Sequence, residues 1–360
     1  MKKSLFALAA LTAVAGAAQA QSSVTLYGTL DASVQYVNNA TATQNDAGVN
    51  DSAVASSVWG LKGSEDLGAG MKANFQFEGD LSIQNGNSNA AGLFRRAAFV
   101  GLSDGKLGAL DLGLKMDPFI AAHGAIPVLG GNSVTTNLAI GSGYSTFFTR
   151  NAITYTMPTI AGVNGQFQYG TANNSDATLG GTTPGFAGGQ TVAGSLSYTN
   201  NGLVVSTAYH HIGDASPAAN SGSAAYFNSA AYSNIITYLA SVKYTFGPLT
   251  GSYGYINNSS TYGVGSVNNM FSVGYAVNPK TTVGATYTNN SGGSTLLNLQ
   301  SRYALSPRTT VWAQISSANN TSNTGAAVFN PVFTGNTGAV ATAATGTTVT
   351  AYGVGVTHTF

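Results

Sequence analysis

The sequence predicts an all-β fold, an antiparallel transmembrane β-barrel of 16 strands. Segments of roughly ten residues alternate between apolar and polar side chains along most of the chain. Charged residues make up only 7% of the 360 residues, whereas about 25% is usual for soluble domains. The breaks between the segments alternate between short and long. A chain whose outer face contacts lipid needs few charges there, so these three observations agree.

Residues 1–20 have the organisation of a secretory signal peptide. Two lysines precede an apolar run, which ends in the small-residue sequence Ala18-Gln19-Ala20. We expect the mature chain to begin at Gln21, and residues 21–360 to form a single barrel domain. No later stretch approaches the ~20 apolar residues of a membrane helix, which excludes a helical membrane protein.

The net charge gives no indication of a nucleic-acid partner. Without the two N-terminal lysines, 11 of the 13 basic residues remain against 12 acidic residues. A nucleic-acid-binding chain would carry a clear basic excess. The chain contains no cysteine, which is compatible with export but also common in other secreted proteins.

Residues 24–37 show the strand pattern clearly. Even positions such as Val24 and Leu26 are apolar, and odd positions such as Asp31 and Gln35 are polar. The same alternation recurs at residues 71–80, 163–169, 238–246, 271–277, 297–305 and 351–360. One such strand would also suit a soluble β-sandwich. However, no Lys, Arg, Asp or Glu lies on the apolar face, as lipid requires, because Arg or Lys at the bilayer midplane costs roughly 2–4 kcal/mol.

The connections between strands form two classes. Short turns rich in Gly, Pro, Asn and Ser lie at residues 64–69, 103–107, 158–162, 199–202, 247–248, 278–280 and 306–308. Long connections lie at residues 38–51, 81–92, 116–149, 171–190, 212–235, 258–267, 290–295 and 317–348. Short periplasmic turns opposite long extracellular loops are typical of an outer-membrane barrel with an even number of strands.

The third long connection, residues 116–149, is unusual. It contains Asp117 and His123 but no Lys or Arg. A structureless segment of this length is uncommon in a compact fold and is usually functional. We therefore expect this third loop to fold into the lumen and to narrow a water-filled pore.

Four motifs resemble the general porins of Gram-negative outer membranes, most closely those of the beta-proteobacterial type. They are SVTLYGTLDA from Ser23, LKGSEDLG from Leu61, FRRAAFVGL from Phe94 and the closing GVTHTF. The resemblance implies a homotrimer in the cell outer membrane, in contact with its lipid and lipopolysaccharide. It also implies passive diffusion of small hydrophilic solutes and ions, and a C-terminal Phe360 that the barrel-insertion machinery reads.

Such porins commonly place strand arginines opposite acidic residues of the third loop. Arg96, Arg150 and Asp117 match this arrangement, but Val58 and Leu114 stand where the family often has arginine. We therefore expect only weak charge selectivity.

Charged residues on the polar faces of the early strands are the candidate pore residues, because charges that line a pore bias which ions pass. They could equally pair with one another and merely solvate the wall. After Asp214 every charged residue is basic, so part of the wall is expected to be basic. The predicted pore-lining residues are Asp31, Lys62, Lys72, Glu78, Asp80, Arg96, Asp111, Lys115, Asp117 and Arg150.

Two other functions are considered. An enzyme would need a nucleophile, a base and an orienting group within reach of one another, and the four histidines show no such spacing. We expect no catalytic residue, cofactor or metal. His210 and His211 could bind a metal, but a polar pair at the rim is the favoured interpretation. An adhesin would use the barrel as an anchor and the long loops for binding, but an anchor does not require so long a third loop.

Overall fold

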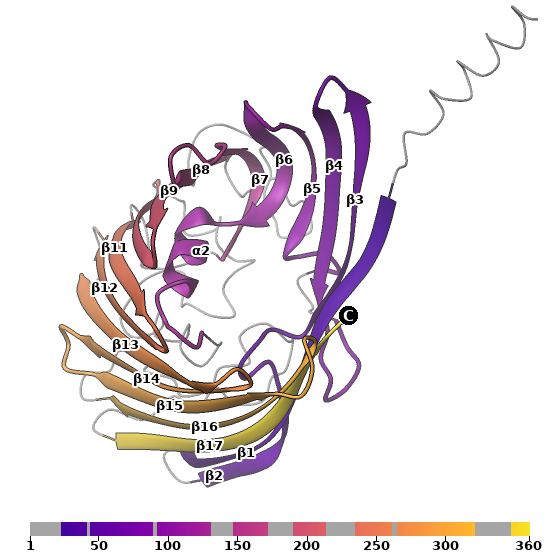
Figure 1. The fold of residues 1–360 in the computed structure, drawn as a ribbon. Helices are drawn as coiled ribbons and strands as arrows, with labels where there is room; N and C mark the ends of the chain where they lie inside the picture. Colours follow the sequence, from indigo (N-terminus) through magenta and orange to yellow (C-terminus); the bar gives the residue numbers. More distant parts are fainter. Residues whose placement is uncertain are drawn as a thin grey trace, which may run out of the picture.

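The computed structural model describes residues 23–41, 44–88, 92–130, 147–171, 190–213, 235–260, 265–320 and 347–360. The predicted signal peptide therefore lies outside the described residues, as do residues 131–146 of the third loop and much of three other long connections. The strands are β1 (Ser23–Thr41), β2 (Gln44–Asp51), β3 (Val58–Gly68), β4 (Met71–Asp80), β5 (Ala97–Asp104), β6 (Gly108–Met116), β7 (Phe148–Thr156), β8 (Val163–Gly170), β9 (Thr191–Asn200), β10 (Leu203–Ile212), β11 (Ile235–Phe246), β12 (Leu249–Ser260), β13 (Ser266–Asn278), β14 (Thr281–Asn290), β15 (Thr295–Ala304), β16 (Thr309–Asn320) and β17 (Thr347–Thr359). One helix, α2 (Pro118–Gly124), lies inside the ring of strands (Figure 1).

Pairing of the first and last strands closes the barrel. Residues 23–29 of β1 pair with β3, and residues 29–38 pair antiparallel with β17. Every strand from β3 to β17 pairs antiparallel with the next in sequence. These strands and β1 form the predicted 16-stranded antiparallel barrel, which leaves no unpaired edge of the ring exposed to lipid.

The first long connection differs from its prediction as a loop. The first strand continues to Thr41, and β2 returns alongside it as a seventeenth strand that pairs with β1. Apolar and polar residues do not alternate here, because residues 38–51 are almost all small or polar on both faces. Backbone hydrogen bonding, rather than burial of one apolar face, forms this extension.

Seven short turns join the strands as predicted, but the first is shorter than expected, because β3 continues to Gly68 and only Ala69 and Gly70 separate it from β4. In the turn between β9 and β10, for example, Asn201 and Gly202 have φ values of 45° and 82°. Positive φ at both central residues is the geometry of a two-residue hairpin, for which Asn-Gly is a strongly preferred sequence.

The side-chain faces also follow the prediction. Large apolar side chains of alternate positions point outward, as Val34, Phe271 and Val354 do, and each is about half exposed. The neighbouring positions Ser33, Ser272 and Gly353 face the lumen. The outer surface is therefore apolar and the interior polar, the reverse of a soluble protein and the arrangement that a bilayer requires.

Two apolar clusters nevertheless lie inside the barrel. One joins Phe119, Ile120 and Ile126 of the third loop to wall residues Ala208, Leu239, Ile256 and Met270. The other joins Ala53 and Val54 to wall residues that include Leu296 and Trp312. Two chain segments therefore pack against the inner wall and reduce the open lumen.

Candidate functional site: the lumen and its two inserts

The third-loop insert, residues 117–130, begins with a capped helix. The side chain of Asp117 accepts a hydrogen bond from the backbone N–H of Phe119 at 2.8 Å, and Pro118 occupies the first turn of α2. A carboxylate at the N-cap and proline in the first turn both favour helix initiation. The helix contacts β8 to β11 on the lumen side, as Figure 1 shows.

Asp117 also anchors this insert to the wall. Its Oδ2 lies 2.8 Å from Nδ1 of His210 on β10, and both side chains are fully buried. Thr149 of β7 donates a hydrogen bond to the same oxygen at 3.4 Å. We expected Asp117 to line the pore, but the structure buries it between loop and wall. His210 faces the lumen side, where Asp117 engages it, whereas His211, the next residue on β10, lies against the ring of the exposed Tyr209, so the two side chains do not form a metal-binding pair.

His123 of α2 is fully buried, and neither ring nitrogen has a hydrogen-bond partner. Burial lowers the pKa of His123 to about 4, because removal from water disfavours the charged ring. The imidazole is therefore neutral at pH 7 and acts as part of the packed helix face.

After α2, residues 125–130 form a strap along the wall. The carbonyl of Ile126 accepts a hydrogen bond from Ser252 Oγ at 2.6 Å, and the N–H of Val128 donates to Ser272 Oγ at 3.0 Å. Lys243 donates to the carbonyls of Ala125 and Pro127, and Arg302 donates to that of Gly130 at 3.1 Å. Side chains of β11, β12, β13 and β15 thus satisfy the backbone of a segment that has no strand partner.

Residues 52–57 form a second insert, the first-loop insert, held by Asp31 of β1. Asp31 is fully buried, and its Oδ1 accepts hydrogen bonds from the backbone N–H groups of Ala53 and Val54 at 2.8 and 3.3 Å. Its Oδ2 accepts from Trp312 Nε1 at 3.1 Å and Thr357 Oγ1 at 2.6 Å. Asp31 was predicted to line the pore, but four donors enclose it, so it anchors the insert.

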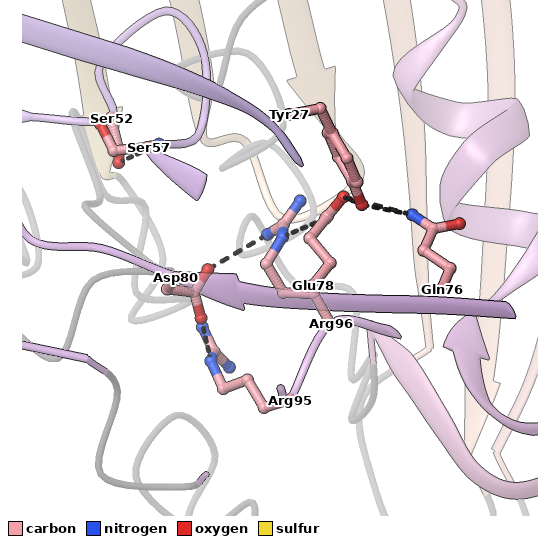
Figure 2. Close-up of polar contacts among 8 residues, drawn as sticks. All are labelled: Tyr27, Ser52, Ser57, Gln76, Glu78, Asp80, Arg95 and Arg96. Carbon is pink, nitrogen blue, oxygen red and sulfur yellow. Dashed lines mark hydrogen bonds and ion pairs between the residues drawn. The ribbon is translucent and has the colours of Figure 1, made fainter. Parts of the chain in front are cut away.

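A ladder of charges lies on β4 and just before β5, next to the first-loop insert, whose Ser57 carbonyl accepts a hydrogen bond from the N–H of Leu81 (Figure 2). Arg96 Nε lies 2.8 Å from Glu78 and its Nη1 lies 3.4 Å from Asp80, which also pairs with Arg95. Glu78 in turn accepts a hydrogen bond from the Tyr27 hydroxyl at 2.8 Å. Glu78, Asp80 and Arg96 are three predicted site residues that the structure brings together. Arg95 was not among the predicted residues, although its place beside Arg96 was a signal.

Other predicted charges lie nearby on the same side. Lys115 forms an ion pair with Asp111, and its Nζ lies 4.7 Å from the centre of the Phe99 ring. Lys62 on β3 is exposed, and its Nζ lies 4.9 Å from the centre of the Tyr27 ring. Most of these charges therefore have an oppositely charged partner nearby, whereas the side chain of Lys62 is exposed to solvent.

The remaining predicted residues lie apart from the ladder. Lys72 is exposed near the short-turn end of β4, and Arg150 is partly exposed on β7. The C-terminal residue Phe360 continues the β17 pairing, since its backbone exchanges hydrogen bonds of 3.1 and 3.2 Å with Gly28. Gly28 is required there, because a Cβ atom would collide with the Phe360 ring.

The lumen-facing apolar residues Leu239, Ile256, Met270 and Leu296 were also missed. Each is at most 1% exposed, and each occupies a position whose strand parity makes it face inward. The sequence feature that could have identified them is an apolar residue on an otherwise polar strand face. Such a residue indicates that another part of the chain covers that part of the wall. Within the described ranges, no group of three His, Asp or Glu side chains could hold a metal ion.

Comparisons with known proteins agree with this architecture. The family described as Gram-negative porin matches residues 7–323. An outer membrane porin of Bordetella pertussis is 31% identical, over 89% of this chain and 95% of its own length. A second outer membrane porin, from Delftia acidovorans, is 37% identical over 57% of this chain and 58% of its own length.

Solved structures show the same fold. An anion-selective porin from Comamonas acidovorans superposes with a TM-score of 0.74 at 24% identity, covering 94% of this chain and all of that chain. The trimer form of OmpT, an outer membrane protein of Vibrio cholerae, gives a TM-score of 0.63 at 14% identity, covering 94% of this chain and 99% of its own. The family match covers most of the sequence and agrees with the closed barrel and polar lumen. The chain therefore belongs to the Gram-negative porin family, and it is a non-enzymatic outer-membrane channel for the diffusion of solutes.

Proposed function

We propose that two inserts narrow this diffusion channel to a bore that passes small hydrophilic solutes and ions. The supporting observation is that the third-loop insert covers the wall from β8 to β15, while the first-loop insert covers lumen-facing residues of β15, β16, β17 and β1. Lys62, the charge ladder and the pair Asp111–Lys115 lie on the side from β3 to β6, outside the parts of the wall that the described residues of the two inserts cover. Solutes then pass between a charged wall and two packed segments.

We further propose a weak preference for anions. Glu78, Asp80, Arg95 and Arg96 compensate one another, as do Asp111 and Lys115. Among the ion pairs of the described residues, none includes Lys62 or Lys243. Beyond the predicted signal peptide, the segments outside the described ranges contribute only Asp176 and Asp214. A small excess of uncompensated positive charge beside the bore favours anions slightly.

Bilayer recordings test both proposals. In a planar bilayer under a KCl gradient, we expect open channels whose reversal potential shows a small chloride preference. Lys62→Gln removes an open lumen charge, so the reversal potential should shift toward potassium. Lys280→Gln is the matched control, because Lys280 is an exposed lysine in the short turn between β13 and β14. Equal shifts in the two variants would contradict a selective role for Lys62, and near-ideal selectivity of the wild type would contradict a weak one.

The assembly is proposed to be a homotrimer in contact with outer-membrane lipid and lipopolysaccharide. Exposed apolar side chains around the barrel, such as Val100, Val205 and Leu299, support burial of this surface by lipid or neighbouring subunits. Residues 1–20 are proposed to be removed before assembly, so that the mature chain begins at Gln21.

Phe360 is proposed as the residue that the insertion machinery reads. We expect Phe360→Ala to reduce the amount of folded protein in the outer membrane, measured by heat-modifiable gel migration. The same variant, purified and refolded in detergent, should still form a barrel, because the backbone pairing of residue 360 with Gly28 does not need the ring. Phe246→Ala is the control, since Phe246 is also an exposed aromatic residue at a strand end. Equal cellular yields of both variants would contradict a signalling role.

A further inference from the structure

The strap of the third-loop insert lies over glycines that face the lumen on three neighbouring strands. Ile126 covers Gly254 of β12, Val128 covers Gly274 of β13 and Leu129 covers Gly284 of β14. A Cβ atom at Gly254 would come within 2.5 Å of the Ile126 side chain, and one at Gly284 within 2.7 Å of Leu129. At Gly274 the added atom would collide with Val128. Cβ atoms do not come so close to other atoms, so a side chain at any of these three positions would push the covering side chain of the strap away.

The three glycines form an oblique line along the wall. Gly274 is registered opposite Gly284, and Gly254 lies four residues farther along, since Thr250 is the partner of Gly274. We call Gly254, Gly274 and Gly284 the glycine track. It follows the direction in which residues 126–129 cross the strands.

Two cations hold the strap at the ends of this track. Lys243 on β11 donates to carbonyls at its start, and Arg302 on β15 donates to Gly130 at its end. Between them Ser252 and Ser272 bind the backbone at Ile126 and Val128. The side chains of the strap pack on the three glycines, and the backbone of the strap is hydrogen-bonded to side chains of the wall. Two independent sets of contacts therefore hold the strap in one position.

From this geometry we propose that the glycine track sets the width of the pore by letting the strap lie flat against the wall. The inference rests on the proposed function, since it concerns the same bore. A side chain on the track would displace Val128 and its neighbours toward the lumen axis, because the β-sheet behind the track is hydrogen-bonded on both sides and cannot retreat. The track residues are therefore positioning residues of the channel.

The test replaces Gly274, where only Val128 lies near the added Cβ at less than 3.5 Å. We expect Gly274→Leu to lower the single-channel conductance and to exclude smaller neutral polymers than the wild type does. Adding Val128→Gly removes the colliding side chain, so the double variant should regain conductance. Gly251→Leu on β12 is the matched control, because a Cβ atom there meets nothing within 4 Å.

Heat-modifiable migration first establishes that each variant is folded. If folded Gly274→Leu channels conduct as the wild type or better, or if Val128→Gly does not reverse the loss, the track does not set the bore. If the wild type conducts and the variants give either of these results, only the proposed role of the glycine track is rejected. A folded, inserted wild type without conductance instead overturns the channel itself, so the two failures are distinguishable.

Discussion

Deleting residues 121–144 of the third loop is expected to raise the single-channel conductance severalfold. The deletion removes most of α2 and the whole strap, which together cover the lumen wall from β8 to β15. The barrel should survive, because its strands pair through the backbone and the described part of the deleted stretch, residues 121–130, belongs to no strand. Conductance in a planar bilayer and the size of polymer that blocks the channel measure the effect.

A deletion of residues 214–234 is the control, since it shortens another long connection to a similar degree. Its conductance should change much less than that of the third-loop deletion. Circular dichroism and heat-modifiable migration establish that both variants retain the barrel. If a folded third-loop deletion conducts like the wild type, residues 121–144 do not limit the bore, and the constriction lies elsewhere.

Asp31→Ala is expected to lower the free energy of unfolding by on the order of 3 kcal/mol, because buried donors that lose their acceptor each cost about 1–3 kcal/mol. The donors affected are the N–H groups of Ala53 and Val54, the Trp312 indole and the Thr357 hydroxyl. Urea unfolding in lipid vesicles, followed by tryptophan fluorescence, measures the loss. Trp312 reports directly, because its indole is bonded to Asp31.

Asp66→Ala is the matched control. Asp66 is exposed, and its carboxylate accepts only a local hydrogen bond from the N–H of Gly68 at 2.8 Å among the contacts of the described residues. Substitutions at such surface positions usually change stability by about 0.5 kcal/mol or less. If the two variants lose equal stability, Asp31 does not anchor the first-loop insert, and a lumen-lining role for its charge is restored.

The barrel itself could be predicted from the sequence. Strand periodicity, turn composition and the absence of charge from one face are local properties, and each is set by whether a side chain meets lipid or water. The predictions at Asn201-Gly202, at Val34 and at Phe271 are confirmed for this reason. The resemblance added the family, which the match over residues 7–323 confirms.

The interior of the lumen was predicted less well. Alternation places Asp31 on the inward face, but it does not distinguish a carboxylate in pore water from one enclosed by four donors. Asp117 was read as a pore charge for the same reason, and its partner His210 lies 93 residues away. Leu239 and Met270 are apolar residues on strand faces that are otherwise polar. Their apolar character is explained only by the third-loop insert, which packs against them.

The closed barrel, its apolar outer face and its membership of a channel family follow from the amino-acid pattern alone. The pairing of the lumen charges, the anchoring of the inserts and the position of the loop on its glycine track became clear only from the packed structure. The difference arises because the first group of features depends on neighbouring residues, whereas the second depends on contacts between residues far apart in the sequence. Lipid exposure acts on every second residue, whereas the bond from Thr357 to Asp31 joins residues 326 positions apart. Such contacts exist only once the barrel has closed and the inserts have packed against its inner wall.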